Sequence, residues 1–386
     1  MGRKKDRNKG RERKIRIDLR RNRAERTRDQ GEWTRLLHAG DDRQEETESA
    51  ENVRAKGELS RKRTIVLHDE QFAAGRVHRG LVVAMRGLIA EVDDGEQLWA
   101  CTVRRLLRTR LIKERHPLAV GDDVRFAPGE EGRIVIDDRE LPEGVIEEAA
   151  PRRTTLLREY GRRLHVVAAN VDQAVIVMAA DMPPLRPHLI DRYLVAAQMG
   201  NMQPVVCVNK ADLDAGGAAA AVVDRYARLG YPSLLTSVVE PRGLDRLQEL
   251  LTDRMSVLFG PSGAGKSSLL NALDPRLSLK VGTLSDLDRG RHTTTTARLL
   301  KWAFGGYVVD TPGLRQFDVP NVAPAQLPGL FVELAELAGQ CRFLDCSHRH
   351  EEACAVKEAL EAGRISPERY ESYCKMYEEC AAKPKY

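Results

Sequence analysis

The chain has 386 residues, of which 42% are hydrophobic and 31% charged, with a formal net charge of +5 at pH 7. This length predicts two to three domains with sizeable hydrophobic cores. We find no signal peptide and no apolar run of transmembrane length, which argues against a membrane protein and predicts a cytoplasmic one.

The N-terminal segment, residues 1–62, differs from the rest of the chain in charge. Residues 1–28 contain fourteen Lys or Arg and four Asp or Glu, so this arm carries +10 and the remaining 358 residues sum to −5. Its few apolar residues, Ile15, Ile17 and Leu19, cannot form a core, and we expect a disordered or transiently helical tail. Such a tail suits the phosphates of structured RNA, although a solubilising tail or a targeting signal has the same composition. Residues 41–58 are rich in Glu and Asp and predict a solvated acidic linker.

Residues 63–150 contain short alternating runs, such as 76–84, 97–103 and 133–136, separated by Gly, Asp and Pro turns. Several short strands in one segment of this size predict a small β-barrel. The turn around Gly121 and the basic run 104–110 suit an OB-fold that binds RNA. A generic five-stranded barrel, whose basic residues only prevent aggregation of edge strands, fits the same pattern.

Residues 151–320 alternate apolar strands with helical segments, including 189–198 and 218–229, which predicts a parallel sheet with helices on both faces. The last segment, 321–386, begins with leucines near helical spacing, which we interpret as core contacts of a helical domain and not as a partner-binding helix. These leucines are Leu327, Leu330, Leu334 and Leu337. The predicted fold class is therefore a multidomain α/β protein.

The first nucleotide motif follows the apolar run 204–208 and consists of Asn209, Lys210, Ala211 and Asp212. The Asp212 carboxylate suits two hydrogen bonds from the guanine edge, and adenine lacks that pair of donors. In isolation the same residues more often form an ordinary loop. After the apolar run 233–235, Thr236 and Ser237 fit a second guanine-contacting loop, on a weaker signal.

A glycine-rich loop lies between the apolar run 255–259 and the helix-like run 268–273, which is the strand, loop and helix context of a phosphate loop. Glycines let the backbone wrap an anion, free amide hydrogens point at the phosphates, and Lys266 adds a charge. Ser267 is placed to bind Mg²⁺. The residues predicted to bind nucleotide here are Gly260, Pro261, Ser262, Gly263, Ala264, Gly265, Lys266, Ser267 and Ser268.

Two later segments complete the predicted GTP site. Asp310 ends the apolar run 307–309, where its carboxylate can hold magnesium, and Gly313 offers its amide to the last phosphate, although ordinary turns share this pattern. Residues 289–296 predict a mobile switch, in which one threonine of 293–296 closes on magnesium. Three motifs at strand ends reinforce one another and favour GTP over ATP.

The C-terminal segment contains a cluster of potential metal ligands: Cys341, Cys346, His348 and Cys354. Three thiolates and an imidazole suit a tetrahedral structural zinc site, and the histidine favours zinc over iron. Reduced cysteines in a helical bundle are the alternative from spacing alone. Four of seven cysteines at one metal site would indicate a reducing compartment.

The order of the nucleotide motifs is permuted, because an ordinary small GTPase begins with its phosphate loop and ends with its base-reading segment. Here residues 209–212 come first, 260–267 second and 310–313 third. Together with the Gly290-Arg-His-Thr-Thr-Thr stretch and the cysteine and histidine cluster, this order resembles the ribosome small-subunit-dependent GTPase A (RsgA) family. The resemblance runs from about residue 70 to the C-terminus.

This resemblance implies an N-terminal OB-fold, a circularly permuted P-loop GTPase domain and a C-terminal helical zinc domain. It favours His348 over His350 as the ligand, and it implies Pro and Gly where this chain has Glu352 and Ala353. It also implies a GTP hydrolase that acts in late maturation of the small ribosomal subunit, with hydrolysis stimulated by the subunit and driving release. The expected partners are the small subunit with its rRNA and GTP or GDP, without a membrane, and we expect a monomer because heptad repeats are absent.

Hydrolysis of GTP requires a water molecule aligned with the third phosphate. Many GTPases place a glutamine after the Asp-x-x-Gly motif, but this chain has Leu314, which cannot orient water. The resemblance suggests His292 for this catalytic role, since a neutral imidazole accepts a hydrogen bond from water. Contact with rRNA or structural packing is the alternative role for His292. A nucleotide-gated RNA scaffold and an ATP-using RNA remodelling enzyme are rival functions, and Asp212 opposes the second.

Overall fold

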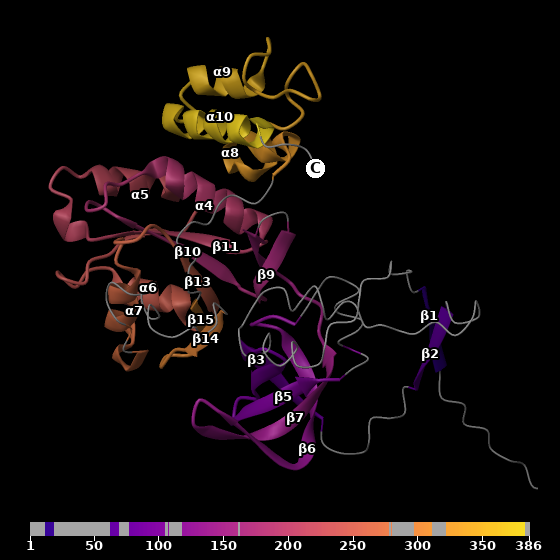
Figure 1. Ribbon diagram of the computed structural model, residues 1–386. Helices are drawn as coiled ribbons and strands as arrows, with labels where there is room; N and C mark the ends of the chain where they lie inside the picture. The colour runs from indigo at the N-terminus through magenta and orange to yellow at the C-terminus, as the bar shows by residue number, and fades with distance from the viewer. Residues whose placement is uncertain are drawn as a thin grey trace, which may run out of the picture.

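The computed structural model describes residues 12–18, 62–68, 77–104, 107, 118–160, 163–277, 279, 297–310 and 322–382. Along the chain these residues form a β-barrel, an α/β domain and a helical module, which confirms the predicted multidomain α/β architecture (Figure 1). Among the described residues, no helix combines the length and the apolar composition of a membrane span.

A short two-stranded sheet precedes the barrel. Strand β1 (Glu12–Asp18) pairs antiparallel with β2 (Lys62–His68). Strand β1 lies in the arm for which the composition predicts no stable structure, and pairing with residues beyond the arm gives its backbone the hydrogen-bond partners that the arm alone lacks. The rest of residues 1–62 lies outside the described residues, so the tail and the acidic linker stay predictions.

The predicted barrel is formed by β3 (His78–Arg86), β4 (Ile89–Asp93), β5 (Leu98–Val103), β6 (Asp123–Ile136) and β7 (Arg139–Ala149). Strand β5 pairs parallel with β7, and β6 pairs with both β7 and β3, so that the five strands close on themselves. Side chains of Val82, Val92, Trp99 and Phe126 fill the interior. Most of the basic run 104–110 lies outside the described residues.

The α/β domain contains an antiparallel hairpin of β8 (Thr155–Tyr160) and β9 (Arg163–Ala169), followed by the central sheet. The sheet strands are β10 (Gln173–Ala179), β11 (Gln203–Asn209), β12 (Ser233–Leu235), β13 (Met255–Phe259), β14 (Arg298–Lys301) and β15 (Tyr307–Asp310). They follow the order β12-β11-β10-β13-β15-β14, and every neighbouring pair is parallel except β14 with β15. The helices are α4 (Pro187–Met199), α5 (Ala218–Arg228), α6 (Leu244–Leu251) and α7 (Lys266–Leu273).

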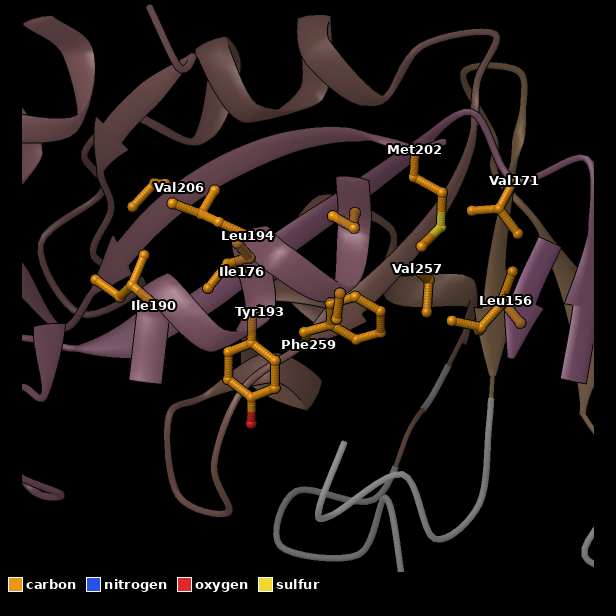
Figure 2. Packing of buried hydrophobic residues seen from close by; sticks show 14 of the residues in the cluster. Leu156, Val171, Ile176, Ile190, Tyr193, Leu194, Met202, Val206, Val257 and Phe259 are labelled. Atoms are coloured by element: carbon orange, nitrogen blue, oxygen red, sulfur yellow. The ribbon is translucent and has the colours of Figure 1, made fainter. Parts of the chain in front are cut away.

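The central strand β10 is buried along its whole length because helices cover both faces of the sheet. Ile176 packs with Tyr193 and Leu194 of α4 on one face, as Figure 2 shows. The next residue, Val177, packs with residues of α6 and α7 on the other face, including Leu247. Burying each such side chain contributes roughly 1.5–3 kcal/mol, so the sheet holds its loops on a well-packed base.

The barrel and the central sheet are joined into one 11-stranded sheet. Arg298 of β14 pairs through its backbone with Ala84 of β3. The Asp93 carboxylate of the barrel accepts hydrogen bonds from Lys301 Nζ at 3.2 Å and Tyr307 Oη at 3.0 Å. These contacts fix the barrel to the edge of the sheet that carries β14.

The C-terminal module packs over α4 and α5 (Figure 1). It contains the 3-10 helix η4 (Pro324–Leu330) and helices α8 (Val332–Ala335), α9 (Ala355–Glu361) and α10 (Pro367–Ala382). The four predicted leucines do pack in its core. Leu327 and Leu330 lie in η4, Leu334 lies in α8 and Leu337 lies in the turn after α8, so they do not share one continuous helix.

A buried ionic cluster attaches this module to the α/β domain. Arg369 of α10 donates to both carboxylate oxygens of Glu333 on α8, at 2.6 and 2.8 Å, and also to Asp191 on α4. Asp191 accepts a further hydrogen bond from Tyr226 of α5 at 2.6 Å. The guanidinium lies 4.6 Å from the centre of the Phe331 ring. One cation therefore compensates two buried carboxylates from different domains.

We predict that Arg369→Met lowers the free energy of unfolding by about 3 kcal/mol, because Asp191 and Glu333 lose their buried counter-charge. Denaturant unfolding followed by circular dichroism measures the change. The matched control is Lys375→Met on the same helix, since Lys375 forms an exposed pair with Glu371 and loss of that pair should change stability by less than about 0.5 kcal/mol. Equal losses in both variants would contradict the assignment of the buried cluster as the attachment.

Candidate nucleotide site and metal centre

The predicted nucleotide-binding residues lie at the carboxyl ends of neighbouring strands. The phosphate loop follows β13, the segment from Asn209 to Asp212 ends β11 and continues from it, Ser237 follows β12, and Asp310 ends β15. Because these strands are parallel, their carboxyl ends meet at one edge of the sheet, where ligands bind in open α/β folds. The tertiary structure thus brings together motifs that are about a hundred residues apart in the chain.

Close backbone approaches explain why the phosphate loop requires glycine at two positions. Gly260 has φ 139°, and a Cβ atom there would lie 2.0 Å from the carbonyl oxygen of Val177. Gly265 has φ 90°, and its Cβ would lie 2.3 Å from Asn209 Nδ2. Helix α7 begins directly after this glycine, so its free amide groups face the loop, and Ser267 is buried in its first turn. This arrangement is typical of a phosphate site.

Lys266 folds back over the phosphate loop. Its Nζ donates to the carbonyl oxygens of Gly260 at 2.7 Å and Pro261 at 2.8 Å. Burial lowers the pKa of Lys266 from its ordinary value of 10.5 to about 8. A phosphate group in the loop would compensate the ammonium charge and raise this pKa again.

Asn209 connects the base-reading segment to the phosphate loop. Its Nδ2 donates to the carbonyl oxygen of Ala264 at 3.0 Å, and its Oδ1 accepts from Thr236 Oγ1 at 3.1 Å. Both Asn209 and Thr236 are buried. The geometry therefore gives Asn209 the role of linking the two loops, and it gives Thr236, which the sequence predicted as part of a guanine-contacting loop, a role as partner of Asn209.

The Asp212 carboxylate is oriented by a neighbouring loop. Ser237 Oγ donates to Asp212 Oδ1 and accepts from the backbone amide of Glu240 at 3.0 Å. Lys210 adopts a left-handed backbone with φ 58°, and its Nζ donates to the carbonyl oxygen of Met182. The turn containing Met182 is a part of the site that sequence motifs missed, because it contributes a backbone carbonyl and any residue type supplies one.

Asp310 is largely buried at the end of β15 and accepts a hydrogen bond from Arg298 Nε at 3.0 Å. Ser267 and Asp310 supply the hydroxyl and carboxylate oxygens that suit Mg²⁺. Gly313, His292 and the threonines at 293–296 lie outside the described residues, so their roles stay predictions.

The four predicted metal ligands converge in the C-terminal module, with their donor atoms within 4.8 Å of one another: Cys341, Cys346, His348 and Cys354. His348 Nδ1 lies 3.4 Å from the sulfur atoms of both Cys341 and Cys354, which are 3.9 Å apart. In a tetrahedron with Zn–S bonds of about 2.3 Å, two sulfur atoms lie about 3.8 Å apart. The donor set and its spacing therefore fit a zinc ion, and His350 is not part of the cluster.

Hydrogen bonds from α10 and from the loop itself hold the metal cluster in shape. Tyr370 Oη donates to the carbonyl oxygen of His348, and Tyr373 Oη donates to that of Ser347, both at 2.7 Å. The Glu351 carboxylate accepts from the backbone amides of Ser347 at 2.7 Å and Arg349 at 3.0 Å. Burial lowers the pKa of His348, which favours the neutral imidazole that binds metals.

Ala353, directly before the last cysteine ligand, has a left-handed backbone with φ 53°. The family resemblance implies glycine at this position, and the structure shows that the backbone keeps the conformation that glycine adopts without strain. This chain therefore stores a small local strain beside the metal cluster.

We predict that Ala353→Gly stabilises the protein by about 0.5–1 kcal/mol, because the relief of left-handed strain exceeds the added entropy of the unfolded chain. Thermal unfolding of the zinc-loaded protein measures the gain. The control Ala355→Gly introduces glycine into the start of helix α9 and should lower stability. A lower melting temperature for Ala353→Gly would contradict the strain argument.

Comparison with known proteins agrees with this geometry. The RsgA GTPase family model matches residues 149–320. The small ribosomal subunit biogenesis GTPase RsgA of Pseudomonas fluorescens is 41% identical over 333 residues, which cover 84% of this chain and 92% of that relative. The Thermotoga maritima protein of the same name is 38% identical over 314 residues, covering 80% and 98%.

Solved structures show the same architecture. The crystal structure of YjeQ from Thermotoga maritima superposes with a TM-score of 0.65 at 35% identity, covering 80% of this chain and 100% of that one. YloQ, described as a circularly permuted GTPase, has a TM-score of 0.63 at 28% identity, covering 83% and 100%. With its loops assembled in permuted order on one sheet edge, the chain belongs to the RsgA GTPase family and is a circularly permuted GTP hydrolase.

Proposed function

We propose that this GTP hydrolase binds the small ribosomal subunit and its rRNA in the cytoplasm and acts in late maturation of the subunit. GTP favours attachment, and hydrolysis, stimulated by the subunit, drives release. Two relatives that span most of the chain are named small ribosomal subunit biogenesis GTPases, which supports the choice of partner. The observation that carries the proposal is the junction at β14, where the strand after the predicted switch pairs with the barrel. A nucleotide-dependent change in the switch is thereby connected to a second binding domain.

The nucleotide roles follow from the site geometry. The backbone N–H groups of Gly260 and of residues 262–268 and the Lys266 ammonium group bind the phosphates, while Asp212 accepts hydrogen bonds from the guanine edge. The hydrogen bonds of Asn209 hold the base-reading segment and the phosphate loop at a fixed separation. Bound Mg²⁺, held by Ser267 and Asp310, would neutralise charge that develops on the terminal phosphates. A monomer suffices for this site, since all these residues come from one chain.

His292 orients the attacking water in this proposal, because the place after the Asp-x-x-Gly motif holds the apolar Leu314. Such a site hydrolyses GTP slowly until the switch is ordered. Contact with the small subunit supplies that ordering, so that hydrolysis occurs on the subunit and ends the attachment.

Charge on the described barrel surface is largely matched. Arg104, Arg125 and Arg133 each pair with a glutamate on β7. The excess positive charge of the protein instead resides in residues 1–28, which carry fourteen basic and four acidic residues. We therefore assign the salt-sensitive part of rRNA binding to this arm and the shape-dependent part to the barrel.

The direct test measures GTP and ATP hydrolysis by the full-length protein, alone and with equal concentrations of isolated small or large ribosomal subunits. We expect strong stimulation of GTP hydrolysis by the small subunit alone, and loss of that stimulation in His292→Ala. The matched control is His350→Ala, which removes an exposed histidine outside the metal cluster and should behave as wild type.

Equal stimulation by both subunits, or none, would contradict the proposed partner. Stimulation that persists in His292→Ala would leave the partner intact and exclude His292 as the catalytic residue. Binding of the subunit without any nucleotide dependence would favour a scaffold in which hydrolysis is incidental.

The affinity for nucleotide should fall as the pH rises, because burial lowers the pKa of Lys266 to about 8. Phosphate favours the charged ammonium form, so the affinity for GDP should decrease about fourfold between pH 7 and pH 8.5 as that form is lost. Fluorescence titration with labelled GDP measures this below the range in which guanine loses a proton. The free energy of unfolding without nucleotide should change in the opposite direction. Lysine in the unfolded chain binds its proton more tightly than Lys266 in the folded protein, so this free energy rises from pH 8 towards pH 10.5.

Lys266→Arg provides the control for this pH dependence, because a guanidinium stays charged throughout the range. Its affinity for GDP should be nearly constant between pH 7 and pH 8.5. A constant wild-type affinity would show that Lys266 does not titrate in this range.

A further inference from the structure

The carboxylate expected to hold magnesium is bound to an arginine in this structure. Arg298 on β14 and Asp310 on β15 are direct partners in the antiparallel register. Arg298 Nε lies 3.0 Å from Asp310 Oδ2. The Arg298 side chain is 47% exposed, whereas that of Asp310 is 11% exposed. The guanidinium thus reaches the carboxylate from the solvent side.

The Arg298 guanidinium and a magnesium ion compete for the Asp310 carboxylate. Both are attracted to the same negative charge, and an ion bound through Asp310 changes the field that holds Arg298. An ion pair with one half-exposed partner is weak, so magnesium binding is able to displace it. Removing the arginine should therefore make the carboxylate more available to the ion.

The structure offers space into which the arginine can move. Arg298 lines a cavity of about 420 Å³ between the barrel and the α/β domain. Asp93 and Glu96 from the barrel line the same cavity. Asp93 already accepts from Lys301 and Tyr307, whereas Glu96 is exposed on a turn. Glu96 thus places an exposed carboxylate on the barrel side of the cavity that Arg298 lines.

The position of Arg298 in the sheet makes this exchange relevant to both domains. Its backbone pairs with Asp310 on one side and with Ala84 of the barrel on the other. It also follows the predicted switch, residues 289–296, by two positions. A change in its side-chain partner therefore occurs at the strand that joins the two domains.

We propose that Arg298 is a positioning residue that competes with magnesium for Asp310 and so couples nucleotide binding to the junction between barrel and GTPase sheet. This inference rests on the nucleotide site proposed above. Substitution of Arg298 should therefore change the magnesium concentration needed for tight nucleotide binding. It should not change the affinity for nucleotide without magnesium.

The experiment measures the affinity of full-length protein for fluorescent GDP over a series of Mg²⁺ concentrations and in EDTA. In Arg298→Gln the Mg²⁺ concentration at half-maximal effect should fall about two- to fivefold, the size expected for loss of an exposed ion pair. Arg298→Lys keeps the charge and should lie between that variant and wild type. The matched control, Arg246→Gln, removes an exposed arginine paired with Glu249 on α6 and should not change the midpoint.

An unchanged midpoint in Arg298→Gln would overturn the inference, as would an equal shift in Arg246→Gln. A change confined to the affinity in EDTA would also overturn it, because that result indicates a structural role. If Arg298→Gln does not fold, an unshifted midpoint in Arg298→Lys overturns the inference and a lowered one supports it. Wild-type protein without magnesium-dependent GDP binding would overturn the site itself, whereas a normal wild-type response with unshifted variants would overturn only the role of Arg298.

Discussion

The parallel alignment of β11, β10, β13 and β15 is the constraint on which the nucleotide site depends. Parallel strands place their carboxyl ends at one edge whatever the order in which the chain visits them. Permuted connectivity therefore leaves the base-reading segment, the phosphate loop and Asp310 as spatial neighbours. The hydrogen bond from Asn209 to Ala264 shows how closely the first two meet, since a methyl group on Gly265 would collide with the same amide.

Permutation changes what is attached to the site and not the site itself. The end of β15 now leads towards the C-terminal module, and β14 lies against the barrel. Arg369 pairs with Glu333 within the module and anchors the module to Asp191 of α4; separating this buried ion cluster would leave charges uncompensated. Its metal cluster is in turn hydrogen-bonded to α10, the helix that carries Arg369. Strand β14 is thus connected to the barrel, and β15 is followed in the chain by the C-terminal module.

Side chains in the site make hydrogen bonds to other parts of the protein. Lys266 is satisfied by loop carbonyls, Asp212 by Ser237 and Asp310 by Arg298. Buried or half-buried polar groups without a partner are costly, so these hydrogen bonds stabilise the loops of the site. In the proposed function, guanine takes the place of Ser237 at Asp212 and magnesium takes the place of Arg298 at Asp310.

The sequence by itself determined the motifs, their order, the four residues of the cysteine and histidine cluster and the general architecture, because glycine spacing, strand patterns and cysteine and histidine spacing are local signals. It did not reveal Thr236 as a partner of Asn209, the Met182 carbonyl beside Lys210 or the pairing of Arg298 with Asp310. It placed the four leucines of residues 327–337 near helical spacing as core contacts, whereas the structure distributes them over η4, α8 and the turn after α8, and it predicted no strand where β1 pairs with β2. Those features were decided by the tertiary structure, since each depends on contacts between segments that no sequence motif or regular spacing connects.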